Sequence, residues 1–209
     1  MNTPINNPKY YNVTQFSSYM TGWWKDVQAA NLDNFPWSGP DDYKPAANAR
    51  VGTDGNCLFV YMETEETDLR MEQKGFGYVH TDSCMEFFMS PDPLSAKYLN
   101  FEFNPAGGMY LAIRTSRHDP ELLNMENYRQ LFGIKTAISE TGWNLEFNIP
   151  LSFLRKYLPS ANFSPGSVIR GNFYKCGEET KRPHHGCWSP INLEKPDFHC
   201  PRFFGSLYL

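Results

Sequence analysis

Carboxylate, amide and hydroxyl side chains alternate with apolar ones along several stretches of this sequence, which is the period-two pattern of a β-strand. In one stretch Glu102 and Asn104 lie on the face opposite Phe101 and Phe103. On a half-buried antiparallel strand such polar groups normally face solvent. Their recurrence on several strands favours a binding surface, because carboxylates and amides pair with vicinal hydroxyls and aromatic rings cover the C–H faces of a sugar ring.

The glutamates of these strands also define a competing chemistry. A glycosidase uses two carboxyl groups, and Glu86, Glu102 and Glu146 have the required residue type. The sequence contains no G-x-S-x-G, H-E-x-x-H or nucleotide-binding fingerprint beside them. We therefore expect these glutamates to bind a ligand or stabilise the fold, and we assign no catalytic residue.

A second group of reactive side chains occupies the last third of the chain. It consists of Cys176, His184, His185, Cys187, His199 and Cys200. A zinc site needs three or four such ligands to converge, and the spacing here matches no zinc finger or ribbon. The sequence context marks none of these thiols as an activated nucleophile. The pattern predicts buried cysteines and hydrogen-bonded histidines, and hence no metal site.

Calcium and haem are alternatives by residue type alone. Acidic residues near one strand end lack the spacing of an EF-hand and are more typical of a solvated loop than of a calcium site. They are Glu63, Glu65, Glu66 and Asp68. Axial ligands for haem are offered by the histidines and by three methionines. These are Met85, Met89 and Met109. We expect no cofactor and keep calcium and haem as open alternatives.

The strands that would position these groups follow one another from residue 48 onward. Runs rich in β-branched and aromatic residues predict strands at 57–63, 84–89, 98–104, 109–115, 134–138, 143–149 and 167–176. The Asp54-Gly55 pair indicates a hairpin turn, and Pro150 begins one short helix that reaches Leu158. These elements predict an all-β fold, an antiparallel β-sandwich of two sheets with one short helix.

Composition narrows the class of protein. The 209 residues suit one domain, which we place at residues 37–209, with an extended N-terminal segment, residues 1–36, packed on its core. The net charge of −4 disfavours a nucleic-acid partner. No stretch approaches the roughly 18 consecutive apolar residues of a membrane span. The 16 Phe, 12 Tyr and 5 Trp are an unusual excess of rings that the fold must accommodate.

The cellular compartment is indicated by the N-terminus and the cysteines. The first residues contain no basic region followed by an apolar one, as a signal peptide would. The 5 cysteines, an odd number, are typical of reduced thiols. These features predict a cytoplasmic protein, and secretion would require a leader that precedes this sequence.

Four ordered stretches carry a resemblance to a known family. They are residues 82–88 (DSCMEFF), residues 100–104 (NFEFN), residues 143–150 (WNLEFNIP), and a C-terminal stretch that begins at residues 171–177 (GNFYKCG) and continues through residues 183–184 (PH), 188–190 (WSP) and 196–199 (PDFH) to residues 204–205 (FG). From about residue 37 to residue 209 the chain resembles the carbohydrate-binding module family 9-like domains, part of the DOMON-like β-sandwich group.

The resemblance implies a β-sandwich of two sheets that binds saccharides and carries structural calcium. In the xylanase-attached modules of this family, two aromatic rings hold a terminal sugar between them, with amide and charged side chains beside it. The matching ring positions fall near His80 and near Trp188 or Phe198. The matching polar positions fall at Glu102 and near Tyr174 and Cys176. The resemblance does not imply catalysis, because a relative described as a xylanase can owe that description to the attached catalytic domain.

Residues and resemblance together predict a non-catalytic carbohydrate-binding protein. Its expected partner is a mono- or oligosaccharide, and neither nucleic acid nor a membrane is expected. A xylanase-like glycoside hydrolase and a haem or metal binder are the alternatives. The predicted ligand-binding residues are His80, Glu102, Asn104, Tyr174, Lys175, His184, Trp188, Phe198 and His199.

Overall fold

The computed structural model describes residues 9–92 and 95–209, and their strands form two β-sheets. In this part of the chain, sheet A has eight strands, in the order β1 (Tyr10–Asn12), β14 (Gly205–Tyr208), β12 (Val168–Gly177), β6 (Cys84–Ser90), β7 (Tyr98–Phe103), β8 (Met109–Arg114) and β9 (Glu121–Leu122), with β13 (His184–Cys187) also paired to β12. Sheet B has six described strands, in the order β10 (Lys135–Ser139), β11 (Gly142–Pro150), β5 (Cys57–Thr64), β4 (Ala47–Thr53) and β2 (Thr14–Gln15), with β3 (Ala30–Asn31) paired to β4.

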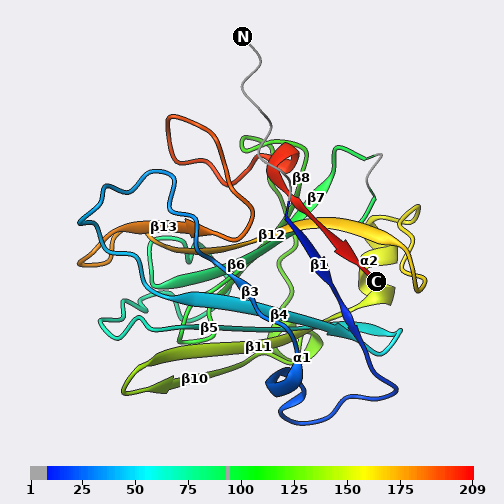
Figure 1. Cartoon of the computed structure of the whole chain (residues 1–209). Coiled ribbons are helices and arrows are strands. Elements are labelled where there is room, and N and C mark those ends of the chain that lie inside the picture. The colour runs from blue at the N-terminus through cyan, green and yellow to red at the C-terminus, as the bar shows by residue number, and fades with distance from the viewer. Residues whose placement is uncertain (1–8, 93–94) are drawn as a thin grey trace.

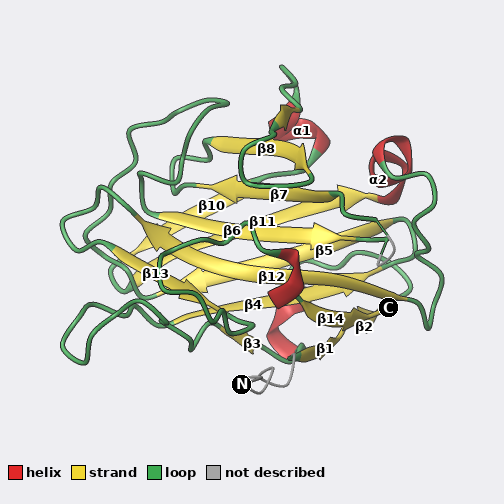
Figure 2. Cartoon of the chain, turned by 90° about the horizontal axis from the view of Figure 1, so that it is seen from above, coloured by secondary structure: helices red, strands yellow, loops and turns green. Residues whose placement is uncertain are grey.

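The two sheets form the layers of a sandwich, so the predicted all-β fold is confirmed. Figure 1 shows β12 and β6 of sheet A above β4, β5 and β11 of sheet B, and Figure 2 shows the same layers from above. All seven predicted strands occur, with each end within one residue of its predicted position. The central pairs are antiparallel, whereas β1 pairs with β14 and β2 pairs with β4 in parallel. The N-terminal segment provides one strand of each parallel pair.

Helices are few and short. The predicted helix is α2 (Leu151–Tyr157), which begins directly after Pro150. A second helix, α1 (Tyr128–Leu131), corrects the expectation of a single one, because four residues are too few to show a helical period. Two 3₁₀ turns are η1 (Trp23–Asp26) and η2 (Pro201–Phe203). No helix in residues 9–92 and 95–209 has the length and apolar character needed to cross a membrane.

Aromatic rings fill the space between the sheets. Phe87 of β6 stacks on Phe173 of β12 with their ring centroids 4.8 Å apart. Phe103 of β7 contacts Phe147 of the facing sheet at a centroid distance of 4.5 Å. All four side chains are buried. Packed sheets lie about 10 Å apart, so bulky rings suit this interior, which explains much of the aromatic excess in the sequence.

The N-terminal segment runs along both sheets. Residues 1–8 of the proposed segment 1–36 lie outside the described residues. Further along, β1 extends sheet A, and β2 and β3 extend sheet B. Tyr11, Trp23 and Leu32 of this segment are buried in the shared core. The segment is therefore tied into the sandwich by backbone pairing as well as by apolar packing.

The outer face of sheet A is also covered. Residues 188–204, which connect β13 to β14, lie over this sheet and are drawn in orange to red in Figure 1. Phe88, Tyr98 and Tyr174 of the sheet form a second apolar cluster with Phe198 and Phe204 of the connection. Polar side chains on this face are consequently enclosed, where a simple half-buried strand would leave them in solvent.

Candidate functional site

A pocket of about 190 Å³ opens where residues 188–204 leave part of the outer face of sheet A uncovered. Strands β6, β7, β8 and β12 contribute its floor, and β13 with neighbouring loops contributes its rim. Three kinds of side chain line it: charged groups, histidines and aromatic rings. The arrangement follows from strand alternation, because every second residue of the floor strands points to this face.

Glu86 and Glu102 form part of the floor, since they stand directly opposite each other in the antiparallel β6–β7 pair. Asn100, two residues before Glu102 on the same face, donates its Nδ2–H to Glu102 Oε1 across 2.6 Å. Glu102 Oε2 is buried and has no hydrogen-bond partner among the described residues. A buried acceptor without a partner costs roughly 1–3 kcal/mol. This oxygen is therefore ready to accept a hydrogen bond from a molecule in the pocket.

Arg114 is held in one orientation beside this carboxyl. Its Nε donates to Asn100 Oδ1 at 3.0 Å, and its Nη2 donates to Tyr110 OH at 2.9 Å. Its Nη1 donates to the backbone oxygen of Arg117 at 2.6 Å. The resulting chain from Arg114 through Asn100 to Glu102 fixes the direction of both charged groups, so a ligand meets a rigid set of donors and acceptors.

Burial raises the pKa of both floor carboxyls. It raises the pKa of Glu102 to about 7, against the opposing effects of the Asn100 hydrogen bond and the Arg114 charge. It also raises the pKa of Glu86 well above its usual range, with further contributions from Cys176 and Glu102. Glu86 therefore keeps its proton to a higher pH than a solvent-exposed carboxyl does. The floor then presents a hydroxyl donor and carboxyl acceptors side by side, a combination that suits a polyhydroxylated ligand.

Two histidines share one glutamate at the rim. Nε2 of His80 and Nε2 of His185 each lie 3.8 Å from an oxygen of Glu178. The His185 ring, and then the charge of His80, lower the pKa of Glu178 against the effect of burial. A carboxylate held between two imidazoles gives this side of the pocket a fixed hydrogen-bonding surface.

His199 is the third histidine of the pocket. Its Nδ1 lies 3.1 Å from Tyr98 OH, and its ring packs on Phe88 with centroids 5.0 Å apart. Burial, followed by the charge of Arg114, lowers the pKa of His199 to about 3. The ring is thus neutral at physiological pH, and it offers a weakly polar surface instead of a positive charge.

Aromatic rings form two walls of the pocket. On one side Tyr78 stacks on Tyr110 with centroids 5.3 Å apart, and the Tyr78 side chain remains well exposed. On the other side Phe198 stacks on Tyr174 at 4.1 Å. Tyr78 and Phe198 both line the pocket. Ring faces on two sides of a polar floor are a common arrangement for binding an amphipathic ring.

Four of the nine predicted ligand residues line this pocket: His80, Glu102, Phe198 and His199. Tyr174 lies beneath it, because its ring stacks under Phe198 and its hydroxyl donates to the Phe198 backbone oxygen at 3.2 Å. The side chain is fully buried. Tyr174 therefore supports Phe198 from below and does not line the pocket.

Trp188 and Asn104 do not line the pocket, and each packs or hydrogen-bonds in another part of the fold. The Trp188 ring is 3% exposed and packs on Tyr11 and Phe173 in the main core, although its neighbours in sequence are polar. A Cβ atom at Gly205 would lie 2.5 Å from this ring, so the glycine is needed for its inward position. Asn104 is fully buried and donates to Gln73 O and Asp82 Oδ2, both at 2.7 Å. The structure therefore does not bring these two residues to the pocket.

Lys175 and His184 lie on the inner side of sheet A, since each alternates with a residue that faces the pocket. Lys175 Nζ lies 2.9 Å from Glu66 Oε2 and 2.8 Å from His184 Nε2. Burial and the Lys175 charge lower the pKa of His184 to about 3. Lys175 and Glu66 are both buried, so this group stabilises the interior and has no access to a ligand in the pocket.

Apart from Glu86 and Glu102, the acidic residues and methionines considered for the alternative chemistries lie away from the pocket. Glu146 belongs to sheet B, where it accepts a hydrogen bond from Tyr19 OH at 2.8 Å. Of the four acidic residues considered for calcium, three form separate ion pairs, Glu63 with Arg50, Glu66 with Lys175 and Asp68 with Lys181, and Glu65 is exposed. The methionines considered for haem, Met85, Met89 and Met109, are buried in the core between the sheets.

The cysteine and histidine residues of the last third are dispersed as well. His184 and Cys187 are buried, His185 and His199 line the pocket, and Cys200 lies near Asp197. Cys176 lies at the floor of the pocket and donates from Sγ to Glu86 Oε1 at 2.9 Å. These six residues therefore do not form the single cluster that a zinc site made from them would need.

Several other lining residues are not among the predicted ligand-binding residues. These are Tyr78, Tyr110, Arg114, Arg117, Glu178 and His185. Tyr110 and Arg114 carried a usable signal, because they lie four residues apart on a predicted strand and must share a face. Tyr78 and Glu178 lie in loops, whose direction strand alternation does not predict.

The fold and pocket together define a class of protein: a two-sheet β-sandwich with a pocket of polar and aromatic residues on the covered outer face of one sheet. The sequence model of the family described as Carbohydrate-binding family 9 matches residues 23–209. The chain belongs to this family. No match was found among curated proteins.

Solved structures are similar over nearly the whole length. A protein from Bacteroides uniformis ATCC 8492, for which carbohydrate binding is proposed, superimposes with a TM-score of 0.82 at 28% identity, over 97% of this chain and 99% of that one. A family 9 carbohydrate-binding module from Caldicellulosiruptor kristjanssonii in complex with glucose gives a TM-score of 0.64 at 15% identity, over 96% and 95% of the two chains. A complex of such a module from the same organism with cellotriose gives 0.68 at 14% identity, over 96% and 93%.

Proposed function

We propose that this chain is a non-catalytic carbohydrate-binding protein and that its pocket on sheet A holds one unit of a mono- or oligosaccharide. The observation that carries the proposal is the Glu102 carboxyl group, which belongs to a residue lining the pocket and whose buried Oε2 has no hydrogen-bond partner in the described residues. A sugar hydroxyl would supply the missing donor. Membership of a carbohydrate-binding family supports this choice of ligand.

The walls and the size of the pocket support the same ligand. Tyr78 and Phe198 offer ring surface for the C–H faces of a sugar, while Glu86, whose pKa is raised by burial, offers a donor in its protonated form and the fixed Arg114 offers others. A volume of about 190 Å³ is small, which favours one sugar ring at a chain end. We expect dissociation constants on the order of micromolar to millimolar, because one sugar ring buries little apolar surface.

Calorimetric titration with glucose and with cellotriose tests the proposal. In Glu102→Gln, Asn100 Nδ2 still requires an acceptor, so the glutamine oxygen takes the place of Oε1 and its NH₂ group takes the place of Oε2. The variant then presents a donor to the sugar where wild type presents an acceptor. We expect affinity to fall roughly tenfold or more.

Glu146→Gln is the matched control, because it changes the same residue type on the other sheet. It should bind the sugars as wild type does. Equal losses in the two variants, or no heat with any mono- or oligosaccharide in a broad panel, would contradict the proposal.

Hydrolysis of a glycoside is the second candidate function, and one observation favours it. Glu86 and Glu102 are adjacent in the pocket, and burial raises the pKa of each, so that one can hold a proton while the other is ionised. We rank it below binding because the family is described by carbohydrate binding. Release of nitrophenol from aryl glycosides by wild type but not by Glu102→Gln would support hydrolysis in place of simple binding.

A further inference from the structure

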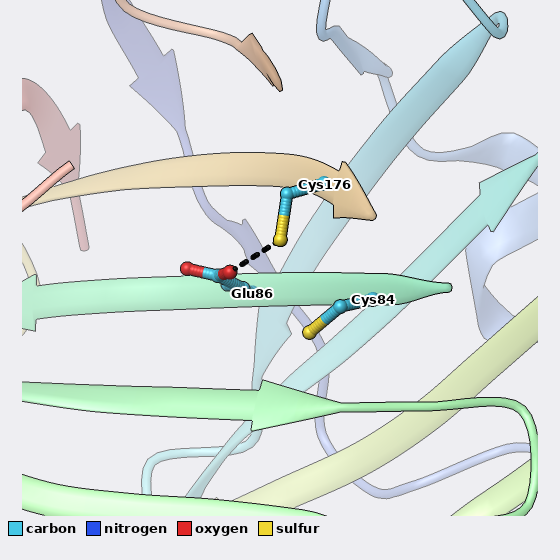
Figure 3. Close-up of side chains that lie close together, drawn as sticks. All are labelled: Cys84, Glu86 and Cys176. Atoms are coloured by element: carbon cyan, nitrogen blue, oxygen red, sulfur yellow. Dashed lines mark hydrogen bonds between the residues drawn. The ribbon is translucent and has the colours of Figure 1, made fainter. Parts of the chain in front are cut away.

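The outer face of sheet A carries a second group of reactive side chains, next to the sugar pocket. Cys84 and Glu86 are two residues apart on β6 and point to the same face, and Cys176 of β12 is the register partner of Cys84. Figure 3 shows the two thiols and the carboxyl gathered on neighbouring strands, with the Cys176 sulfur directed at Glu86. All three side chains are buried.

The spacing of these groups is close to that of a metal site. Their ligand atoms all lie within 4.8 Å of one another, and Cys176 Sγ lies 2.9 Å from Glu86 Oε1. Zinc–sulfur bonds of about 2.3 Å place two tetrahedral thiolates roughly 3.8 Å apart. Closure around an ion therefore requires side-chain movements of the order of 1 Å, without a change in the strand register.

We propose that Cys84, Glu86 and Cys176 form a three-residue site for a thiophilic divalent ion, of which zinc is the best match, and that the fourth coordination position faces the pocket. Thiolate ligands select soft or borderline ions over calcium and magnesium, which prefer oxygen. Three protein ligands with one open position is the arrangement that zinc adopts where it also contacts water or another molecule.

Access and charge are consistent with such a site. Glu86 and Cys176 both line the pocket, so an ion can enter from it, whereas Cys84 is buried and does not line the pocket. Two thiolates and a carboxylate would leave a net charge of −1 around a divalent ion. Lys175 Nζ donates to the Cys176 backbone oxygen at 2.8 Å, which places a positive charge close to the sulfur. An ion bound here would use Glu86 as a carboxylate ligand in place of the donor in the proposed sugar site, but the ion needs no sugar in order to bind.

Cobalt(II) is the probe for a test, because it replaces zinc and makes thiolate coordination visible. The full chain, reduced with a phosphine and freed of metal, is titrated with Co²⁺ in the absence of sugar. We expect sulfur-to-cobalt charge-transfer bands and tetrahedral ligand-field bands that saturate at one ion per chain and disappear when Zn²⁺ is added.

Two variants and one control separate the site from other thiols. Cys84→Ser should abolish the charge-transfer bands. Glu86→Gln preserves the shape of the side chain but removes a metal ligand. Loss of a residue that only hydrogen-bonds to a ligand weakens metal binding roughly 10- to 100-fold, and we expect a larger loss here. Cys57→Ser, a partly exposed thiol on sheet B, should bind Co²⁺ as wild type does. Far-ultraviolet circular dichroism confirms that each variant is folded.

Three results would overturn the proposal. The first is a folded, reduced wild type that gives no cobalt bands. The second is binding that Glu86→Gln leaves unchanged or that Cys57→Ser removes. The third is a peptide map showing Cys84 and Cys176 joined in a disulfide in protein purified without reductant. Because no sugar is present in the titration, a negative result here leaves the saccharide proposal unaffected.

Discussion

Asn100 Nδ2 donates a hydrogen bond to Glu102 Oε1 across 2.6 Å, and this contact leaves the second oxygen of the same carboxyl free to accept from the pocket. The amide is itself held by Arg114, whose Nε donates to Asn100 Oδ1 at 3.0 Å. A strand of alternating residues thus produces a rigid acceptor, because Asn100 and Glu102 are neighbours on one face of β7.

The raised pKa of Glu102 predicts a specific dependence of stability on pH. The folded-state pKa of about 7 lies above the value of 4.5 for a free glutamate carboxyl. Between these two values the unfolded chain loses its proton first, so the free energy of unfolding falls as pH rises. Glu102→Gln removes this effect. We expect its stability to gain about 1–3 kcal/mol on wild type between pH 5 and pH 8, measured by urea unfolding.

Glu63→Gln is the control for this experiment, because its pKa moves in the other direction. Despite burial, hydrogen bonds from Asn48, Arg50 and Tyr61 lower the pKa of Glu63. The stability that the ionised Glu63 contributes is therefore fully present above the pKa that Glu63 has in the unfolded chain. It is lost only at lower pH. Its difference from wild type should stay constant from pH 5 to pH 8. A Glu102→Gln difference that is equally constant would contradict the raised pKa of the buried Glu102 carboxyl.

The lowered pKa of His199 predicts that the free energy of unfolding falls as pH is lowered, which is the opposite pH dependence to that of Glu102. Burial lowers its folded-state pKa to about 3, so below about pH 6.5 the unfolded chain takes up a proton that the folded chain does not. Stability is then lost as pH falls from about 6.5 toward 3. Because the ring is partly exposed, we expect His199→Gln to reduce this loss by only about 1 kcal/mol at pH 5. His118→Gln, at an exposed position, should follow wild type in the same thermal or urea unfolding series.

The buried ion pair of Lys175 and Glu66 should be costly to break from one side only. Lys175→Met leaves the Glu66 carboxylate in the interior, with the Trp143 Nε1–H at 3.4 Å as its remaining hydrogen bond. Loss of one partner of such a pair costs about 3–5 kcal/mol. The double variant Lys175→Met/Glu66→Leu should recover part of this loss in chemical denaturation. Strictly additive losses would show that the two groups do not interact.

Much of this fold could be predicted from the sequence, because strand patterns are local. The predicted strand at 143–149 became β11 (Gly142–Pro150), and that at 98–104 became β7, since alternation and turn residues are visible within a few positions. The short strand β13 (His184–Cys187) was not predicted, because its pairing with β12 depends on the path of the intervening turn. Local sequence pattern therefore predicts the strands themselves better than it predicts which segments pair with them or lie over them.

The site could be predicted only in part, for the same reason. Glu102 and Phe198 were selected from the polar face of a strand and from the family resemblance, and both line the pocket. Trp188 was selected with them, yet its ring turns inward because the loop after β13 brings it over Gly205. Lys175 alternates with Tyr174 and so faces inward, and its partner Glu66 lies more than a hundred positions earlier in the sequence. Contacts at such separation leave no local signal.

Two aromatic residues should respond to substitution in opposite ways. Tyr78 is 63% exposed at the rim of the pocket, so Tyr78→Ala should weaken glucose binding several-fold while the melting temperature stays near that of wild type. Trp188 is packed in the core, and Trp188→Ala should cost about 3–5 kcal/mol of stability. Calorimetry and thermal unfolding of both variants check this. Reversed results would place the sugar against Trp188 and away from the pocket described.

The saccharide proposal is tested most directly by a crystal structure of the chain soaked with glucose. We expect one sugar ring in the pocket on sheet A, with a hydroxyl donating to Glu102 Oε2 and with ring contacts to Tyr78 or Phe198. Glucose bound on the outer face of sheet B, or bound in the pocket without contact to Glu102 Oε2, would contradict the account.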